Sequence, residues 1–517
     1  MKGDSMKGFT RRRLVQGASA AASASFLGAA AAPATTPTTA GVYSRIGVRP
    51  FINMTATFTI NGGTPMLPEV KQAMEEASQW AVNLDELAEK AGVRIAQLLE
   101  AEAAIVSAGC AAALSLATAA CIAGSDPEKM KQLPDATGLR NEVLIAKQSR
   151  NDYDHAFRSG GGKLVEYDTP EEFHAALGHR TAMIVILGTA EARGQMRLEE
   201  IAKAARKAGV PVLVDAAAEL PLRPNPFLSR GADLVAYSGG KILRGPQSAG
   251  ILMGRKDLVR AAWWNGSPHH AFARSMKVSK EEVIGMVTAV EMFVNKRKLE
   301  DEYRVWESWY KQISDEVTKV AGIRTRMLPP AGASPFPVME VAWDRERIDL
   351  IGDQVRQMLL DGEPRIMSHA EGESTQFLIR AVAMKPEHPP MVARRLVEIF
   401  RSARGKTEIH KAAPAADITG AWDVDIEFDA GTSRHLLLIE PSEDRNHLRG
   451  AHVGRTARGR FRGSIDGDSV RLDSILPAEG MRLRYRFRGR LQGDTLRGEL
   501  DLGEFGRGRW SARRAQG

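Results

Sequence analysis

Two residues that can do chemistry together follow two predicted strands of this 517-residue chain. The apolar run 210–214 ends in Asp215, and the run 233–236 leads through Tyr-Ser-Gly-Gly to Lys241, 26 residues further on. A lysine amine can form a Schiff base with an aldehyde, and a carboxylate can keep a pyridine nitrogen protonated so that the ring withdraws electrons. The spacing therefore predicts an acid and an amine at one edge of a sheet.

The same chemistry needs an anion site, and a glycine turn provides a candidate. Gly109 lies between the short apolar run 103–106 and the alanine-rich segment 111–122, which has the composition of a helix. Free N–H groups and the dipole at a helix N-terminus favour phosphate, and glycine lets the backbone approach closely. Each feature alone also fits an ordinary cap or turn. Their order, phosphate turn, then acid, then lysine, predicts a pyridoxal phosphate site.

Strands and helices that alternate along the chain would position these residues. Near-continuous apolar strands between helices predict an α/β fold with a mainly parallel sheet that is covered on both faces. Ligands of such folds bind beyond the carboxyl ends of the strands. The predicted strands are 103–106, 142–145, 163–166, 182–187, 210–214, 233–236 and 250–253, and the predicted helices include 69–80, 84–99, 111–122 and 198–208.

Longer motifs resemble one family of fold-type I pyridoxal phosphate enzymes, the aminotransferase-like family that contains seryl-tRNA selenium transferase and D-glucosaminate-6-phosphate ammonia-lyase. The resemblance is close over 42–291 and looser over 292–404. Segment 150–155 is more similar to the ammonia-lyase-like branch, and an exported protein would meet no aminoacyl-tRNA. The motifs that carry the resemblance are 53–57, 107–113, 150–155, 215–221, 238–250 and 274–282.

The resemblance implies a role for each residue of the cofactor site. Lys241 would be the Schiff-base lysine and the mobile acid/base, and Asp215 would hold the pyridine nitrogen of pyridoxal 5'-phosphate. Its phosphate would be bound by the backbone N–H groups of Gly109, Cys110 and Ala111, together with Ser238.

Segment 150–155 follows the strand 142–145 and would cover the face of the cofactor ring. His155 or Tyr153 would stack there. In the alternative interpretation Tyr153 packs in the fold and Asn151 or Asp154 caps a helix.

Arg150, Asn151 and Arg274 are the candidate substrate-binding residues. A guanidinium group suits a carboxylate or a phosphate, although either arginine can equally belong to a salt bridge. His269 and His270 are adjacent and lack an acidic third ligand, so we expect no metal site.

The first residues have the pattern of an export signal. Three arginines at 11–13 precede the small, weakly apolar run 17–31, which resembles a twin-arginine signal peptide. We therefore predict a signal over 1–31, a linker over 32–41, recognition by the twin-arginine export machinery and a periplasmic location.

Cysteine usage fits export of an already folded protein. Cys110 and Cys121 are the two cysteines of the chain. If the segment between them is helical, they lie ~16 Å apart, too far for a disulfide.

The chain beyond residue 291 divides into two further parts. Helices at 300–321 and 390–402 with strands at 338–342 and 376–379 predict a small α+β lobe over 292–404. In fold-type I enzymes such a lobe closes on the substrate, and the site commonly lies at a dimer interface, so we expect a homodimer or higher homo-oligomer. Arg380 would reach a substrate carboxylate or lie on the surface.

A linker at 405–415 precedes a small all-β domain over 416–517, a barrel or a sandwich. This part has eighteen Arg and no Lys, and its Gly-x-Trp opening resembles lipocalin-like barrels. Its arginine face either binds an anionic surface or glycan, or is solvated and balanced by the sixteen acids of the domain. The predicted strands are 418–428, 434–440, 448–452, 459–465, 469–474, 481–490 and 495–502.

Composition excludes a disordered, collagenous or coiled-coil protein, because 43% of residues are apolar and 26% charged. The net charge of +8 is too dilute for a nucleic-acid partner. We therefore expect an exported enzyme that acts on an amino acid or amino-sugar acid, by α,β-elimination. Racemisation and transamination begin with the same steps. A non-catalytic envelope-binding protein on the same scaffold is the hypothesis from another class.

Overall fold

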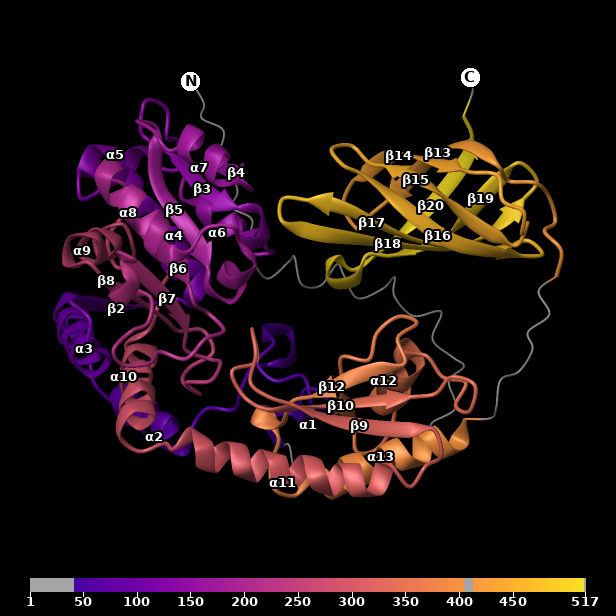
Figure 1. The fold of residues 1–517 in the computed structure, drawn as a ribbon, viewed down its shortest axis with the longest axis horizontal. Helices are drawn as coiled ribbons and strands as arrows, with labels where there is room; N and C mark the ends of the chain where they lie inside the picture. Colours follow the sequence, from indigo (N-terminus) through magenta and orange to yellow (C-terminus); the bar gives the residue numbers. More distant parts are fainter. Residues whose placement is uncertain (1–40, 404–411, 516–517) are drawn as a thin grey trace, which may run out of the picture. The chain divides into compact units, whose positions relative to one another are not determined.

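A computed structural model describes residues 41–403 and 412–515. The predicted signal at 1–31 lies outside the described residues. Of the described residues, 41–50 belong to one unit, which contains the short helix α1 (Gly41–Ser44), and those from Phe51 onward belong to the second (Figure 1). Among the described helices, none combines the length and the apolar character of a membrane span.

The site is built on a seven-stranded sheet with the order β2-β8-β7-β6-β5-β3-β4 (Figure 1). Strand β8 is antiparallel to both of its neighbours, and β7, β6, β5, β3 and β4 are parallel to one another. The predicted mainly parallel sheet is confirmed. The strands are β2 (Ala103–Ser107), β3 (Glu142–Ala146), β4 (Lys163–Tyr167), β5 (Thr181–Leu187), β6 (Val212–Asp215), β7 (Leu234–Ser238) and β8 (Gly250–Gly254).

Helices cover both faces of this sheet. Side chains of α3, α8 and α10 join one core cluster with the strands, and side chains of α4, α6 and α9 join another. Nearly every residue of α4 is buried, which explains its apolar, alanine-rich sequence. The helices are α2 (Pro68–Ser78), α3 (Leu84–Leu99), α4 (Cys110–Ala123), α5 (Pro127–Gln132), α6 (His155–Ser159), α7 (Pro170–Ala176), α8 (Leu198–Ala208), α9 (Lys256–Trp264) and α10 (Lys280–Asn295).

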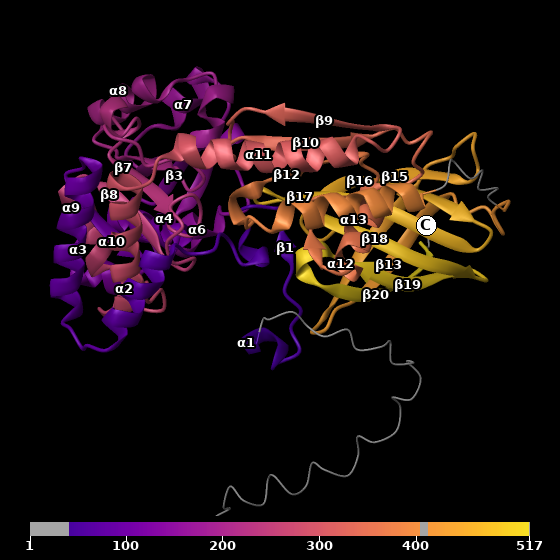
Figure 2. The ribbon, with the colours of Figure 1, turned by 90° about the horizontal axis from the view of Figure 1, so that it is seen from below.

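The small lobe contains a three-stranded antiparallel sheet in the order β12-β10-β9. The long helix α11 packs on α13 and along the strands (Figure 2). The predicted α+β lobe is confirmed, with β9, α12 and β11 in addition. Its elements are α11 (Leu299–Val317), β9 (Ile323–Leu328), β10 (Val338–Trp343), α12 (Gly352–Asp361), β11 (Ile366–Met367), β12 (Gln376–Ile379) and α13 (His388–Ser402), and β1 (Ile52–Asn53) pairs with β11.

Residues beyond 412 form a closed antiparallel barrel of eight strands, each paired with its sequence neighbour. Seven strands were predicted, and β20 was missed because arginine and glycine dominate its sequence while only Trp510 and Ala512 are buried. The strands are β13 (Gly420–Glu427), β14 (Thr432–Ile439), β15 (His447–Val453), β16 (Arg458–Asp466), β17 (Ser469–Ala478), β18 (Met481–Gln492), β19 (Thr495–Asp501) and β20 (Arg507–Arg514).

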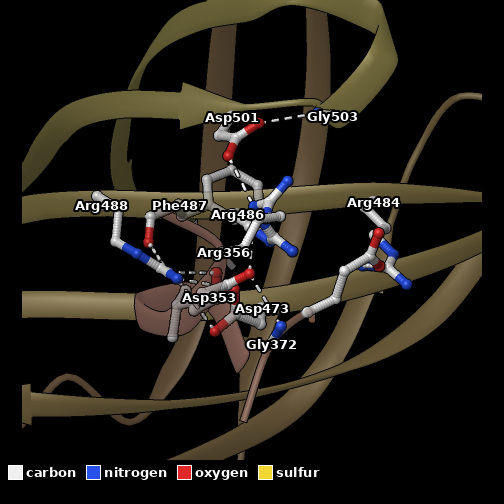
Figure 3. Close-up of polar contacts among 12 residues, drawn as sticks. Asp353, Arg356, Gly372, Asp473, Arg484, Arg486, Phe487, Arg488, Asp501 and Gly503 are labelled. Atoms are coloured by element: carbon white, nitrogen blue, oxygen red, sulfur yellow. Dashed lines mark hydrogen bonds and ion pairs between the residues drawn. The ribbon is translucent and has the colours of Figure 1, made fainter. Parts of the chain in front are cut away.

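Arginines on the outer face of β18 pair with acids on the neighbouring strands. Arg488 donates to Asp473 at 2.9 Å, and Arg486 lies 3.5 Å from Asp501 (Figure 3). These pairs support the interpretation that the domain's own acids balance this face.

A buried polar chain crosses the barrel interior. His435 Nδ1 lies 2.7 Å from His452 Nε2, and His452 Nδ1 lies 2.8 Å from Ser474 Oγ. The Tyr485 ring packs against both imidazoles. Burial, followed by the neighbouring His435, lowers the pKa of His452 to about 3, and burial also lowers the pKa of His435. Both imidazoles are therefore neutral at pH 7.

Acid should destabilise the barrel through these histidines. In the unfolded chain His452 takes up a proton with a pKa of about 6.5, whereas in the folded barrel its pKa is about 3. Between these two pKa values the unfolded state binds more protons, so the free energy of unfolding decreases as the pH falls below 6.5. The loss between pH 6.5 and 5 should be about 1.7 kcal/mol from His452 alone. Calorimetry of the full chain should show a steep pH dependence of the barrel transition. The double variant His435→Leu/His452→Phe should flatten it, and an unchanged slope would contradict this assignment.

Candidate functional site

The predicted acid, amine and phosphate turn meet at the carboxyl edge of the sheet. Asp215 ends β6, Ser238 ends the adjacent parallel strand β7, and Lys241 follows three residues later. Gly109 reaches the same edge from β2, since the Sγ atom of the next residue, Cys110, lies 3.8 Å from Asp215 Oδ1. The sequence prediction of a shared edge is thus borne out by the strand order.

Asp215 is a buried carboxylate, with 4% of its surface exposed. Its Oδ1 atom accepts hydrogen bonds from the Ala217 N–H at 3.0 Å and from the Cys110 thiol. Burial raises the pKa of Asp215, while the Ala217 N–H and the Lys241 charge oppose this rise. No cationic group among the described residues hydrogen-bonds Asp215, so the site can accept one from a ligand.

The Cys110 side chain has a role that the sequence did not reveal, since only its N–H was predicted to act. Burial, and then the charge of Asp215, raise the pKa of Cys110 well above its ordinary value. The thiol therefore stays protonated and donates to Asp215. Cys110 and Cys121 are both free.

The turn at Gly109 has the geometry of an anion site. Gly109 has φ 86° and ψ 167°, a conformation that favours glycine, and no side chain caps the helix α4 that begins at Cys110. The first N–H groups of this 14-residue helix are therefore available to a phosphate. A Cβ atom on Gly250 would lie 2.6 Å from the Cys110 nitrogen, so glycine is needed at Gly250 for β8 to pass under the turn.

A tight turn holds Lys241. The Arg244 N–H donates to the Lys241 carbonyl at 3.0 Å, and the Gly245 N–H donates to the Gly239 carbonyl at 2.9 Å. A Cβ atom on Gly240 would lie 2.5 Å from Gln247 Cα, so the turn packs directly on the following segment. The backbone around Lys241 is thereby fixed, while its side chain is partly exposed.

The loop 150–155 is held by its own polar contacts. Asn151 Oδ1 accepts from the Tyr153 N–H at 2.7 Å. His155 is exposed, and its ring lies 3.0 Å from Arg158. Burial, and then the charge of Asp215, raise the pKa of the Tyr153 phenol. The stacking role of His155 stays a prediction.

Of the arginines with a predicted substrate role, Arg150 is occupied and Arg274 is free. Arg150 forms ion pairs with Asp154 and with Glu166, which is the salt-bridge alternative that the sequence left open. Arg274 is exposed, and within 41–403 and 412–515 no side chain pairs with it. Their substrate roles, and that of Asn151, stay predictions.

Arg380 has the environment of an anion-binding residue. It follows β12, its backbone N–H donates to Met54, and its guanidinium donates to Ser334 Oγ at 3.3 Å. Burial lowers its pKa, and no acid among the described residues neutralises it. A substrate carboxylate would supply that missing charge.

Glu219 was missed by the sequence analysis, although it lies in the motif 215–221. Its Oε1 atom is buried without a hydrogen-bond partner among the described residues. Burial, then the charges of Asp215 and Glu191, raise the pKa of Glu219 to about 7. An acidic residue four positions after Asp215 in an apolar turn was the available signal.

Comparisons with known proteins agree with this geometry. Residues 71–280 match the class-V aminotransferase family. The chain is 31% identical over 266 residues to D-glucosaminate-6-phosphate ammonia lyase of Salmonella typhimurium, which covers 49% of this chain and 70% of the relative. It is 34% identical over 299 residues to 5'-C-glycyluridine monooxygenase-decarboxylase of a Streptomyces species, which covers 55% of this chain and 73% of the relative. The chain belongs to the fold-type I family of pyridoxal phosphate-dependent enzymes.

A solved structure of D-glucosaminate-6-phosphate ammonia-lyase supports the same assignment. It superposes with a TM-score of 0.63 at 26% identity, over 71% of this chain and all of that one. The C-terminal barrel lies outside the residues that the family model matches.

Membership in this family implies pyridoxal 5'-phosphate as the cofactor, and the residues fit it. The buried Asp215 lacks a cationic partner, which a protonated ring nitrogen provides. The uncapped N-terminus of α4 at Cys110 fits the phosphate, and Lys241 lies in the turn that follows β7, the strand next to the one that Asp215 ends. The cofactor prediction is confirmed.

Replacement of Asp215 by Asn should weaken cofactor binding. The variant keeps the shape but loses the charge that the ring nitrogen requires, so the dissociation constant for pyridoxal phosphate should rise about ten- to a hundredfold. Asp168→Asn is a matched control, because Asp168 also follows a parallel strand but is exposed. Equal affinity of Asp215→Asn and the control, measured by absorbance titration, would refute the role of Asp215.

Proposed function

We propose that this protein is an exported pyridoxal phosphate-dependent enzyme that removes ammonia from a β-hydroxy amino acid or amino-sugar acid by α,β-elimination. The observation that carries the proposal is the buried Asp215 beside the Lys241 turn at one sheet edge. The ammonia-lyase name of a 31% identical relative supports elimination. The net reaction converts the substrate into a 2-oxo acid and ammonia.

The residues of the chain divide the chemical work. When bound, pyridoxal phosphate supplies a ring that withdraws electrons from the substrate α-carbon. Lys241 Nζ takes the α-proton, and Asp215 keeps the ring nitrogen protonated so that this withdrawal continues. The β-hydroxyl leaves as water, and hydrolysis then releases ammonia. Burial of Asp215 excludes water from this interaction and strengthens it.

Arg380 is the proposed partner of the substrate carboxylate. Its guanidinium is half-buried and lacks an acidic partner among the described residues, and Thr55 of the N-terminal segment lies beside it through a parallel bridge. Arg274 is the second candidate, because its exposed side chain can reach a phosphate or carboxylate at the far end of an amino-sugar acid.

We further propose a homodimer and a periplasmic location. Phe58 and Ile60 are 49% and 79% exposed, and they belong to a segment that the Gln247 side chain joins to the Lys241 loop. A second copy would cover these apolar side chains next to the site. The consecutive arginines at 11–13 support export by the twin-arginine machinery.

Oxidative decarboxylation is the second candidate reaction. A relative with 34% identity is named a monooxygenase-decarboxylase, so relatives of this chain carry names for two different reactions. The two reactions differ in gas exchange, since decarboxylation by a monooxygenase consumes O₂ and releases CO₂, whereas elimination does neither.

Turnover of a substrate panel tests the proposal. Purified holoprotein with D- and L-β-hydroxy amino acids and amino-sugar acids should release ammonia and 2-oxo acid in equal amounts, with loss of α-deuterium and no O₂ uptake. Lys241→Ala should lower turnover about a thousandfold or more, and Lys203→Ala, an exposed lysine of α8, should not. O₂ uptake with CO₂ release would favour the second candidate. Ligand binding without turnover would support the non-catalytic hypothesis.

A further inference from the structure

Glu219 has a buried carboxyl oxygen without a partner, at the edge of the sheet where the cofactor binds. Its Oε1 atom contacts no hydrogen-bond donor among the described residues. An unsatisfied buried carboxyl oxygen is costly, so such an atom in a ligand site indicates a partner that the ligand supplies. The Asp215 charge acts on this carboxyl, which places the two acids near each other.

The contacts of Glu219 fix its position along the sheet edge. Leu187, at the end of β5, pairs with Asp215, at the end of β6. A Cβ atom on the next residue, Gly188, would overlap Glu219 Oε1 and lie 3.0 Å from the Phe227 ring. The Glu219 carboxyl therefore lies over β5, one strand beyond Asp215.

The strand order then indicates which edge of a bound cofactor ring would face Glu219. The phosphate turn at Gly109 and the Lys241 turn lie toward β8 and β7, on the other side of Asp215 from β5. In pyridoxal phosphate the phosphate arm is on one edge of the ring, and the 3-hydroxyl and methyl groups are on the opposite edge. With the phosphate held at α4 and the nitrogen at Asp215, the hydroxyl edge would face β5.

We propose that Glu219 is a positioning residue that donates a hydrogen bond to the 3-oxygen of the pyridoxal ring. The inference rests on the cofactor assignment and deepens the proposed function. The 3-oxygen is on the ring carbon next to the one that bears the aldehyde group, to which the lysine nitrogen would bind. A hydrogen bond donated to this oxygen would lower the pKa of the lysine nitrogen when the cofactor is bound to it.

The surroundings of Glu219 raise its pKa to about 7, so the protonated form that can donate a hydrogen bond is populated near neutral pH. Asp215 and Glu191 are the acids that act on it, and Glu191 is paired with Arg230. Tyr237 is a further titratable residue on which the Glu219 charge acts, and its hydroxyl accepts from the Asn225 amide at 2.8 Å. No cation among the described residues is paired with Glu219 to offset this rise, so at a pKa of about 7 the carboxyl is about half protonated at pH 7 and mostly protonated below it.

The pH titration of the visible absorbance of the holoprotein tests this role without any substrate. The yellow form holds a proton between the lysine nitrogen and the ring 3-oxygen, and a donor to that oxygen competes with this proton and lowers its pKa. Glu219→Ala should therefore raise the midpoint by about one to two pH units. Glu219→Gln keeps a donor and should shift it by less than about 0.3 units.

A second variant moves the carboxyl without removing it. Gly188 does not have a positive φ, so its backbone accepts alanine, and the new methyl group would displace the flexible end of Glu219. Gly188→Ala should raise the midpoint in the same direction as Glu219→Ala. Glu171→Ala, at an exposed acid of α7, is the control and should leave it unchanged.

The outcomes separate this inference from the proposed function. A midpoint that is unchanged or lowered in both Glu219→Ala and Gly188→Ala would overturn the role of Glu219, even if ammonia release is normal. A raised midpoint in both variants would support it, even if the panel of substrates shows no elimination. If Glu219→Ala fails to fold, the midpoints of Gly188→Ala and Glu219→Gln decide the question.

Discussion

The cofactor site depends on one buried carboxylate, that of Asp215. Asp215 is 4% exposed and receives hydrogen bonds only from a backbone N–H and a thiol among the described residues. An ionised carboxylate in such a place is costly without a cation. A protonated pyridine nitrogen satisfies it, and the same pairing makes the ring an electron acceptor. The same ion pair between Asp215 and the ring nitrogen would thus both bind the cofactor and activate it.

Close backbone packing holds the groups around that carboxylate. The lack of a side chain at Gly250 lets the phosphate turn lie on β8, and Gly240 lets the Lys241 turn lie on Gln247. The Thr64 N–H donates to the Gly240 carbonyl at 3.3 Å, which ties the N-terminal segment to the same turn. That segment also carries β1 to the small lobe. The lysine turn and the lobe that bears Arg380 are therefore linked through one stretch of chain.

The sequence predicted the large-domain strands and the shared edge because apolar runs, turns and the positions of Asp215 and Lys241 are local signals. It did not predict that the Cys110 thiol touches Asp215, because this contact joins residues 105 positions apart and depends on how α4 crosses the sheet. The raised pKa of Glu219 could not be predicted from the sequence either, since it is caused mainly by burial and not by residue type. Strand β20 was not predicted from the sequence, because most of its residues are exposed or partly exposed arginine and glycine and few are buried and apolar.

The proposed roles of these residues all require that Lys241 carries the cofactor covalently beside Asp215. Borohydride reduction of freshly purified holoprotein, followed by peptide mass mapping, tests it most directly. We expect a phosphopyridoxyl group on the peptide that contains Lys241, and no other lysine labelled in comparable yield. An unmodified Lys241, with the protein folded and saturated with pyridoxal phosphate, would contradict it.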